Sequence, residues 1–466
     1  LNFLGGYLAF AGGKVEPGDE SIPLADGLDT ETPELLGCAV RELFEETGIL
    51  ALRGATTAGD ELKKLRLRLP GDAGTERFFS AMRESGARLE PGTFQEAIRL
   101  VTPRFSKRRY SSTFFLLETG DEPEILPGEL AAGGWWAPAD ALEKWRLGEL
   151  LLAPPVIVIL RQLENGIGPG TLESLRSSPE TFEGSGLAIP WGPGIELLPF
   201  HCPPLPVTLP SSTFLAGARR FVIIDPAPTG KKEQEHLLAA IENRIAGGDR
   251  PEAIVLSHHH IDHVGAVNAV QERWSLPCWG HRRTAELLER SFDRELDEGD
   301  LIDLGDSPAG AAGWKLRCLF TPGHAEGHLA FFDERHRALL AGDLVSTLVS
   351  MYVGTPGGHL ETYFRSLEKI RSLDIRLLYP SHGMPTLDAR GLIDRTIEHR
   401  KKRIGQVLRK LEKGFHSVEE IAGEVYRDKA DSRLRPLYER TTRAALEYLV
   451  EHEQAGKVAE DLYETG

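Results

Sequence analysis

Four histidines and one aspartate within seven residues constrain this chain more than any other feature of its sequence. They form the segment Ser257–His263, which directly follows the apolar, β-branched run Ala253–Leu256. A short apolar run of this kind predicts a buried strand, so the cluster begins where that strand ends. In extended chain His258 and His260 point to the same side, and residues 262–263 then turn toward a second position. Imidazole and carboxylate groups at this spacing can supply two adjacent metal ions from one loop.

Three later segments carry metal-ligand residues at the same kind of place. Thr321–His324, Leu340–Asp343 and Tyr379–His382 each follow or close an apolar, strand-like run. Such runs alternate with helical stretches, which is the pattern of an α/β fold, and α/β proteins assemble their sites at the C-terminal ends of strands. A histidine-rich surface loop is the alternative interpretation of the first segment, but it leaves the later three unexplained.

Together these segments resemble the metallo-β-lactamase superfamily. The loop matches the H-x-H-x-D-H motif of that family, and the later ligand positions follow in the family's order. The resemblance covers about residues 191–390 and implies an αββα sandwich with a dinuclear metal site. It implies one ion bound by His258, His260 and His324, a second bound by Asp262, His263 and His382, and Asp343 bridging the two. Asp225 and His328 would support these ligands.

The chemistry implied by this resemblance is metal-dependent hydrolysis. Two divalent transition metals, zinc before iron or manganese, suit a ligand set of imidazoles and carboxylates. Such ions can hold a bridging hydroxide and polarise the carbonyl or phosphoryl group of a substrate. Asp262 and Asp343 are therefore the expected catalytic residues of this part of the chain.

A second signal is a helix that carries clustered carboxylates. Residues 34–46 have the apolar period of an amphipathic helix, and Gly48 follows where a helix end favours a left-handed residue. Glu42, Glu45 and Glu46 then share one face. Neighbouring carboxylates repel one another unless a cation neutralises them. A hard divalent ion such as magnesium or manganese does so, and it also binds pyrophosphate oxygens.

This helix resembles the second half of a Nudix box, and residues 10–18 resemble the glycine turn that opens the box. The resemblance implies an α/β/α Nudix domain in which Glu42, Glu45 and Glu46 bind magnesium or manganese. Glu45 and Glu46 would be catalytic, and Arg41 would position a carboxylate. The two halves of the box are separated by an insertion, and this insertion resembles the coenzyme A diphosphatase branch of the Nudix family. A Nudix-like domain without catalysis and a chance amphipathic helix are the alternatives.

These signals divide the chain into four parts. We expect a Nudix-like domain over residues 1–165, whose natural start lies upstream of residue 1, and a linker over the glycine-, serine- and proline-rich residues 166–190. The metallo-β-lactamase domain spans residues 191–390, and a winged-helix-like module of three helices and a β tail spans residues 391–466.

The last part resembles the tail of β-lactamase-like endoribonucleases, which makes RNA a candidate partner. A face that follows phosphates would need Arg400 and Arg403 together on one side of a helix. The alternative is that the basic run His399–Arg403 is a solvated helix face on a packing module.

Composition limits the functions that remain. The net charge of −16 argues against a general nucleic-acid binder. The longest apolar run, residues 150–160, contains two prolines and is too short to cross a bilayer, so we expect no membrane partner. Four scattered cysteines and the lack of a leader pattern favour a reducing cytoplasm.

We therefore expect a cytoplasmic, dinuclear metal-dependent hydrolase. A small-molecule substrate with a thioester, such as an acyl-CoA, is favoured, together with a second, magnesium-dependent Nudix diphosphatase activity. One alternative is an endoribonuclease specific for single-stranded RNA. The other is a regulatory protein whose Nudix-like domain binds a nucleotide without catalysis.

Overall fold

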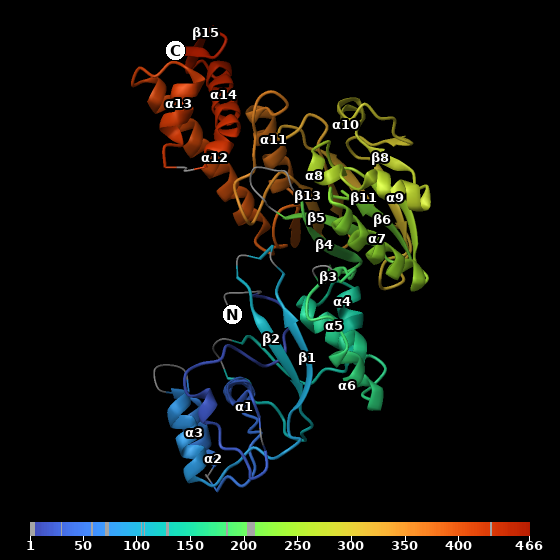
Figure 1. Cartoon of the computed structure of the whole chain (residues 1–466), viewed down its shortest axis with the longest axis vertical. Coiled ribbons are helices and arrows are strands. Elements are labelled where there is room, and N and C mark those ends of the chain that lie inside the picture. Colours follow the sequence, from blue (N-terminus) through green and yellow to red (C-terminus); the bar gives the residue numbers. More distant parts are fainter. Residues whose placement is uncertain are drawn as a thin grey trace. The chain divides into compact units, whose positions relative to one another are not determined.

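In the computed structural model the chain divides into two compact units (Figure 1). Unit 1 comprises Leu1–Val101, Tyr110–Trp145 and Glu149–Glu180, and unit 2 comprises Thr102–Arg109, Arg146–Gly148 and Thr181–Gly466. The structure describes residues 5–28, 30–56, 59–69, 74–103, 105–106, 108–126, 130–182, 185–202, 210–428 and 431–466.

Unit 1 consists mainly of helices around a short β-ribbon. Its elements are a 3-10 turn η1 (Asp19–Ser21), α1 (Pro33–Thr47), α2 (Gly59–Arg66), α3 (Gly74–Glu84), β1 (Gln95–Val101), β2 (Ser111–Leu116), α4 (Pro138–Arg146), α5 (Pro154–Leu163) and α6 (Pro169–Arg176). Within the described part of unit 1, the antiparallel pair β1–β2 is the one sheet formed. The wider sheet of the α/β/α sandwich expected for residues 1–165 is therefore not seen there.

Helix α1 begins and ends close to the predicted bounds. Pro33 takes the first turn, where the missing N–H costs nothing, and Gly48 ends the helix at φ 76° with its N–H on the carbonyl of Phe44. Phe44 stacks on Phe78 of α3 with ring centroids 5.3 Å apart, and both side chains are buried. This packing turns the opposite face of α1, with its glutamates, away from the core.

Residues 166–190, expected as a linker, contain helix α6. Leu175 of α6 is fully buried against Ile98 of β1 and Ile159 of α5. Part of this segment therefore belongs to the core of unit 1, because leucines at helical spacing outweigh the flanking glycines. Residues 183–184 of the expected linker lie outside the described residues.

Unit 2 contains two mixed sheets. The first has the order β3-β4-β5-β6-β7-β8-β9, and the second has the order β10-β11-β12-β13-β14. The strands are β3 (Ile189–Gly192), β4 (Ile195–His201), β5 (Pro210–Gly217), β6 (Arg220–Ile224), β7 (Arg250–Val255), β8 (Cys278–Gly280), β9 (Arg294–Glu295), β10 (Leu301–Gly305), β11 (Trp314–Phe320), β12 (Leu329–Asp333), β13 (Ala338–Gly342) and β14 (Leu377–Pro380). In both sheets antiparallel pairs come first and parallel pairs follow.

Helices cover the outer faces of this sandwich. The intervening helices are α7 (Lys231–Ala246), α8 (Ile261–Val264), α9 (Val267–Trp274), α10 (Arg282–Leu287) and α11 (Leu360–Arg371). Leu237 of α7 and Val270 of α9 pack in one cluster with the first sheet, and Leu367 of α11 packs with the second. Each sheet thus buries one face on its partner and the other on helices, which gives the αββα layering expected from the sequence.

The C-terminal residues form three helices and a β-ribbon, namely α12 (Ala389–Leu411), α13 (Val418–Val425), α14 (Arg435–Glu451), β15 (Ala455–Ala459) and β16 (Leu462–Thr465). A short 3-10 turn, η2 (Ser432–Leu434), precedes α14. Ser417 and Glu420 cap α13 reciprocally, as their spacing predicts.

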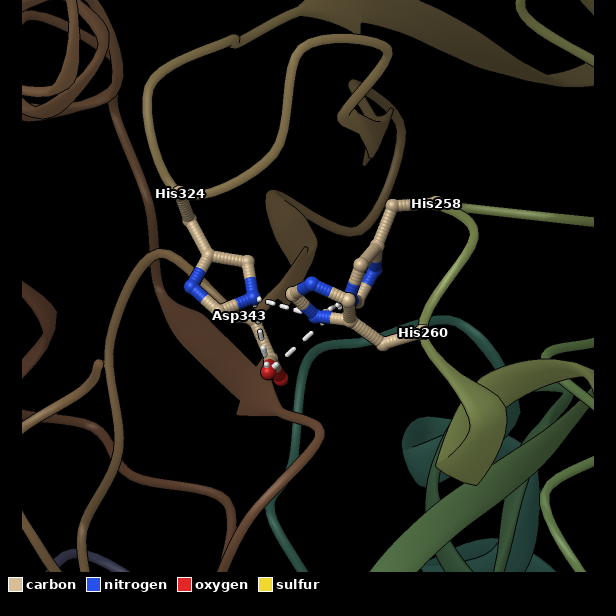
Figure 2. Close-up of side chains that lie close together, drawn as sticks. All are labelled: His258, His260, His324 and Asp343. Carbon is tan, nitrogen blue, oxygen red and sulfur yellow. Dashed lines mark hydrogen bonds and ion pairs between the residues drawn. The ribbon is translucent and has the colours of Figure 1, made fainter. Parts of the chain in front are cut away.

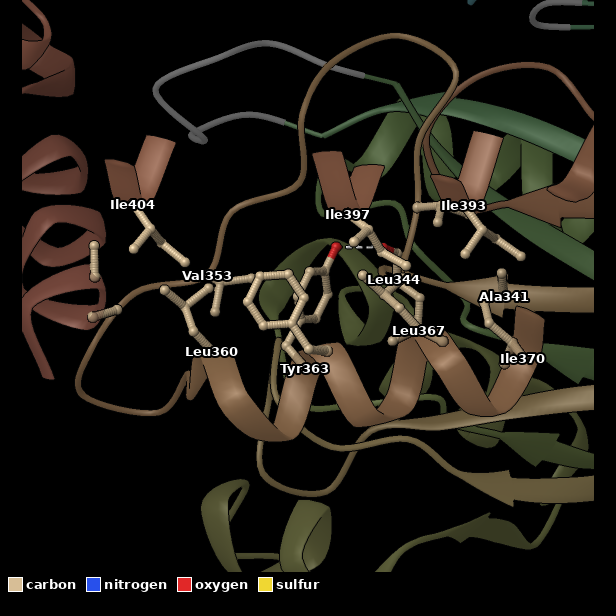
Figure 3. Close-up of a cluster of buried hydrophobic side chains, with 14 of the residues drawn as sticks. Ala341, Leu344, Val353, Leu360, Tyr363, Leu367, Ile370, Ile393, Ile397 and Ile404 are labelled. Atoms are coloured by element: carbon tan, nitrogen blue, oxygen red, sulfur yellow. Dashed lines mark hydrogen bonds between the residues drawn. The ribbon is translucent and has the colours of Figure 1, made fainter. Parts of the chain in front are cut away.

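These helices share one hydrophobic cluster with the second sheet. Figure 3 shows Ile397 and Ile404 of α12 facing Tyr363 and Leu367 of α11. The same cluster reaches Leu449 of α14 and the β-ribbon. The C-terminal part is therefore packed on the sandwich through apolar contacts and not only tethered to it. No helix in the described ranges is both long and apolar enough to cross a membrane.

This shared core predicts that a defect in it destabilises unit 2. Leu367→Ala removes a fully buried side chain and should lower the free energy of unfolding by about 2–5 kcal/mol. Urea unfolding followed by far-UV circular dichroism measures this loss. Arg365→Ala, on the exposed side of the same helix, is the matched control and should leave the midpoint nearly unchanged. Equal midpoints for Leu367→Ala and wild type would contradict the shared core.

Candidate metal centre

Strand ends bring the predicted ligands together at one edge of the sandwich. β7 ends at Val255, just before the histidine loop, and β13 ends directly before Asp343. β11 and β14 end shortly before His324 and His382. In the second sheet β13 and β14 are parallel neighbours, and β11 runs in the same direction on the other side of β12. The carboxyl ends of these three strands therefore lie at one edge of the sheet, where α/β proteins gather their sites.

The first group of ligand atoms comes from His258, His260, His324 and Asp343, which point toward one another in Figure 2. The Nδ1 atom of His260 lies 3.0 Å from Nε2 of His258 and 3.0 Å from Nε2 of His324. In tetrahedral zinc with bonds of about 2.0–2.1 Å, neighbouring nitrogens are about 3.3 Å apart. The three rings are thus spaced close to what one ion requires.

The second group consists of Asp262, His263 and His382, all buried. Asp262 Oδ2 lies 3.6 Å from Nε2 of His263 and 3.5 Å from Nε2 of His382. Asp262 and His263 come from α8, and His382 comes from the loop after β14. Residues that are adjacent in the histidine loop therefore serve two different groups, as the alternation in the sequence predicts.

Asp343 lies between the two groups and offers one carboxylate oxygen to each. Its Oδ2 is 3.3 Å from Nε2 of His324, whereas its Oδ1 is 3.5 Å from Nε2 of His263 and 3.2 Å from Nε2 of His382. A carboxylate in this position can join two metal ions. Among the described residues, Nε2 of His263 and Oδ1 of Asp343 are buried without a hydrogen-bond partner. Buried polar atoms seldom lack partners, and two divalent ions would satisfy both. The donor set fits the metals that the sequence implies.

Hydrogen bonds on the far side of the ligands hold their orientation. Asp225, just after β6, accepts from the backbone N–H of Ser257 at 2.7 Å and from the Ser257 hydroxyl at 2.6 Å. Its Oδ2 also lies 2.9 Å from Nδ1 of His263, so that Nε2 faces the metal position. Such outer contacts fix the tautomer of a ligating imidazole and raise its basicity. The supporting role predicted for Asp225 agrees with these contacts.

Other outer contacts have no signature in the sequence. Ser211 at the start of β5 donates to Oδ2 of Asp262 at 2.7 Å. The carbonyl of Tyr352 accepts from Nδ1 of His324 at 2.6 Å, and the carbonyl of Pro210 lies 3.1 Å from Nδ1 of His382. The contact of His328, in contrast, was predicted: this side chain accepts the backbone N–H of Asp343 at 3.0 Å.

Burial and charge make the two groups electrostatically different. In the first group burial lowers the pKa of His258 well below its ordinary value, that of His260 to about 3 and that of His324 to about 4. In the second group burial also opposes protonation, but nearby carboxylates, Asp343 foremost, raise the pKa of His263 and His382. Asp343 is buried too, yet His382 and His263 hold its pKa well below the ordinary value.

Comparison with known proteins matches residues 205–382 to the family model described as Metallo-beta-lactamase superfamily. This chain carries a metallo-β-lactamase domain. The domain is a metal-dependent hydrolase fold with the His/Asp clusters described above. The family match lies within unit 2, so the Nudix-like reading of residues 1–165 and the winged-helix reading of residues 391–466 stay predictions.

The relatives of the metallo-β-lactamase domain have been given different protein names. The chain is 28% identical over 235 residues to a Caenorhabditis elegans protein named Beta-lactamase-like protein 2 homolog, covering 48% of this chain and 74% of the relative. It is 26% identical over 201 residues to an Aspergillus fumigatus atrochrysone carboxyl ACP thioesterase, covering 42% of this chain and 58% of that protein. A crystal structure of a beta-lactamase domain protein from Burkholderia ambifaria superposes with a TM-score of 0.52 at 20% identity, over 60% of this chain and 94% of that chain, and shows the fold.

The glutamate helix of unit 1 carries a second set of predicted site residues. Arg41 donates from Nε and Nη2 to both oxygens of Asp19, at 2.8 and 2.9 Å, and from Nη1 to Glu42 at 2.7 Å. The N–H of Gly12 donates to Glu46 at 2.9 Å, and a Cβ on Gly13 would meet Glu42 at 2.1 Å. A side chain at Gly13 would therefore displace the Glu42 carboxylate. Burial raises the pKa of Glu42, while Arg41 opposes that rise.

The structure does not place Arg400 and Arg403 together on an exposed face, as binding of phosphates by this helix would need. Arg400 is only 5% exposed and lies over the Tyr363 ring, 5.9 Å from its centroid. Arg403 is half-buried over the ring of Tyr426, 4.5 Å away. The apolar phase of α12, with Ile397 and Ile404 on either side, turns Arg400 inward. The run of basic residues in the sequence does not reveal which side of the helix faces the core.

The difference between the two groups predicts a stepwise loss of metal on acidification. Protons compete for His263 and His382, whose pKa is raised, before they compete for His258, His260 and His324, which are neutral until much lower pH. Metal content per chain should therefore fall from two ions toward one at a higher pH than the pH at which the remaining ion is lost. Elemental analysis after gel filtration at each pH measures this. Release of both ions over one and the same pH range would contradict the assignment.

Proposed function

We propose that the metallo-β-lactamase domain hydrolyses small-molecule thioesters, with two divalent ions, zinc before iron or manganese, held by the residues described above. The observation that carries this proposal is the Asp343 carboxylate, which offers one oxygen to each group of ligand atoms. When bound, the ions supply Lewis-acid polarisation of the scissile carbonyl and activation of water near neutral pH.

The residues of the chain orient that chemistry. Asp225, Ser257 and Ser211 hold His263, His258 and Asp262 in place, so the ligand atoms are aimed before substrate arrives. Asp262 and Asp343, the proposed catalytic residues, present carboxylate oxygens that accept hydrogen bonds from the attacking water. Water adds to the carbonyl carbon, the carbon–sulfur bond breaks, and the leaving sulfur takes up the proton that the water has lost.

A thioester suits this site because of its leaving group. A thiol has a pKa of about 8.5 and departs as a thiolate without help from a protonating side chain. The polar groups described around the clusters are metal ligands or hold those ligands in place. A substrate whose leaving group needs no proton from a side chain therefore suits this site best. The thioesterase named among the relatives supports this choice, and the net charge of −16 disfavours a long polyanion.

The contacts of α1 favour a second activity in unit 1, cleavage of a nucleoside diphosphate compound with magnesium or manganese. Arg41, held by Asp19, neutralises Glu42 and lies 3.9 Å from Glu45, so the carboxylates stay clustered on one face. The backbone at Gly12–Gly13 closes on this face, as a Nudix box requires. Glu42, Glu45 and Glu46 would bind the ion, in a domain similar to the coenzyme A diphosphatases. A Nudix-like domain that binds a nucleotide without cleaving it is the alternative.

An endoribonuclease acting through the C-terminal module is the weaker candidate. Three helices and a two-stranded ribbon have the order of a winged helix. The arginines that would follow phosphates are otherwise engaged, however, since Arg435 pairs with Glu419 and Arg443 with Asp461, while Arg400 is buried.

The first experiment compares substrates on purified, zinc-loaded protein. We expect hydrolysis of acyl-CoA or acyl-glutathione thioesters and none of a fluorogenic single-stranded RNA. Asp343→Asn should abolish the activity and remove at least one zinc per chain, because the amide carries no charge and has an oxygen for only one of the two groups. If the protein cleaves the RNA and leaves the thioesters intact, the ribonuclease hypothesis replaces this proposal.

A second experiment separates the two units. Glu45→Gln combined with Glu46→Gln should abolish magnesium-dependent cleavage of coenzyme A or a nucleoside diphosphate sugar, because the ion loses two charged ligands. Thioester hydrolysis should be unchanged, since the ligand sets share no residue. Glu34→Gln, at the start of the same helix, is the matched control. A folded double variant that still cleaves diphosphates would show that these glutamates are not catalytic.

A further inference from the structure

We propose that helix α14 positions the metal ligand His324, and that Thr355 and Glu447 are the positioning residues through which it does so. The contact between them joins the C-terminal helices to the segment that touches this ligand. The inference concerns the metal centre itself and holds whichever substrate the domain uses.

His324 depends on a neighbouring segment for its orientation. Its Nδ1 donates to the carbonyl of Tyr352 at 2.6 Å, which leaves Nε2 to face Asp343 and His260. A metal-ligating imidazole is held in place by this kind of outer hydrogen bond. Because the acceptor is a backbone carbonyl in a loop, the imidazole is only as well placed as residues 352–358 are.

The backbone around His324 rests on the same stretch of chain. The carbonyl of Gly323 accepts the N–H of His359 at 2.8 Å, and the carbonyl of Pro322 accepts from Ser366 at 2.7 Å. Gly323 has φ +126°, and a Cβ there would lie 2.3 Å from the nitrogen of Tyr363. Ligand loop and supporting segment therefore meet with no room for a side chain.

Helix α14 holds the supporting segment in its turn. Thr355 donates its hydroxyl to Glu447 at 2.6 Å and its N–H to the carbonyl of Arg440 at 3.3 Å. One turn further along α14, a carboxylate oxygen of Glu451 lies 2.7 Å from Nε2 of His359. Arg440, Glu447 and Glu451 are spaced seven and four residues apart, so they fall on one face of α14.

These contacts form one continuous path from α14 through residues 352–359 to His324. The helix is itself fixed by the hydrophobic cluster that contains Leu449. Figure 3 shows two further members of that cluster, Val353 in the loop and Tyr363 of α11. Among the polar links of this path, the Thr355–Glu447 hydrogen bond joins two side chains and is half-buried, whereas the His359–Glu451 pair is exposed. Losing the Thr355–Glu447 hydrogen bond should let Tyr352 move, which loosens the imidazole without removing any ligand.

The test measures zinc affinity by competition with a chromophoric chelator. Thr355→Val keeps the shape of the side chain but removes the donor, and we expect about tenfold weaker binding of zinc, at the lower end of the range for outer contacts of metal ligands. Glu447→Leu should give the same loss. Thr355→Ser keeps the hydroxyl and should retain wild-type affinity. Glu439→Gln, whose carboxylate pairs with Arg435 on the same helix, is the matched control and should also retain it.

Two further readouts distinguish positioning from plain stability. In the double variant Thr355→Val, Glu447→Leu, zinc affinity should be no lower than in either single variant, because one hydrogen bond can be lost only once. The midpoint temperature of thermal unfolding of the metal-free protein should shift no more in Thr355→Val than in Glu439→Gln. Zinc affinity within twofold of wild type in Thr355→Val, or additive losses in the double variant, would overturn the proposal.

Discussion

A buried carboxylate surrounded by buried imidazoles is the arrangement on which the rest of unit 2 depends. Asp343 is almost inaccessible to solvent, yet His263 and His382 keep its pKa low, so it remains charged. A buried charge is tolerated only when every neighbour compensates it. Metal ions bound by His258, His260, His324, Asp262, His263 and His382 would do so on one side of this centre. On the other side Asp225, Ser211, His328 and the carbonyl of Tyr352 each hold a ligand or its backbone, and their own strands and loops are placed accordingly.

The sandwich meets this requirement by letting ligands arrive at strand ends. Strands are rigid and buried, whereas the loops after them are short, so the histidine loop and Asp343 are held with little freedom. The same architecture leaves one ligand less secure. His324 lies in a loop whose support comes from residues 352–366, and that support is completed by the C-terminal helices. The shared hydrophobic cluster packs these helices on the sandwich, although they lie beyond the residues that the family model matches.

Electrostatics divides the centre into two unequal halves. The rings of the first group are neutral because burial outweighs the pull of Asp343, while those of the second are drawn toward the charged form by Asp343, Asp262 and Asp225. Protons would therefore compete with an ion in the second group at higher pH than with an ion in the first, although both groups share one carboxylate. Unit 1 uses the opposite arrangement, since its clustered carboxylates are compensated by a buried arginine, Arg41, held between Asp19 and Glu42.

The sequence by itself determined which side chains could meet at the metal centre, because the histidine loop, Asp343 and His382 each stand next to a strand whose apolar run is easily recognised. It also determined where α1 ends and where α13 begins, because Gly48 and the Ser417–Glu420 pair act locally. Only the tertiary structure decided that Ser211 and the Tyr352 carbonyl support the ligands, since hydroxyls and backbone groups carry no pattern that marks a distant partner. It also decided that Arg400 is buried. A basic residue next to other basic residues suggests solvent, but the helical phase set by Ile397 and Ile404 places it in the core, and that phase takes effect only when α12 packs on α11.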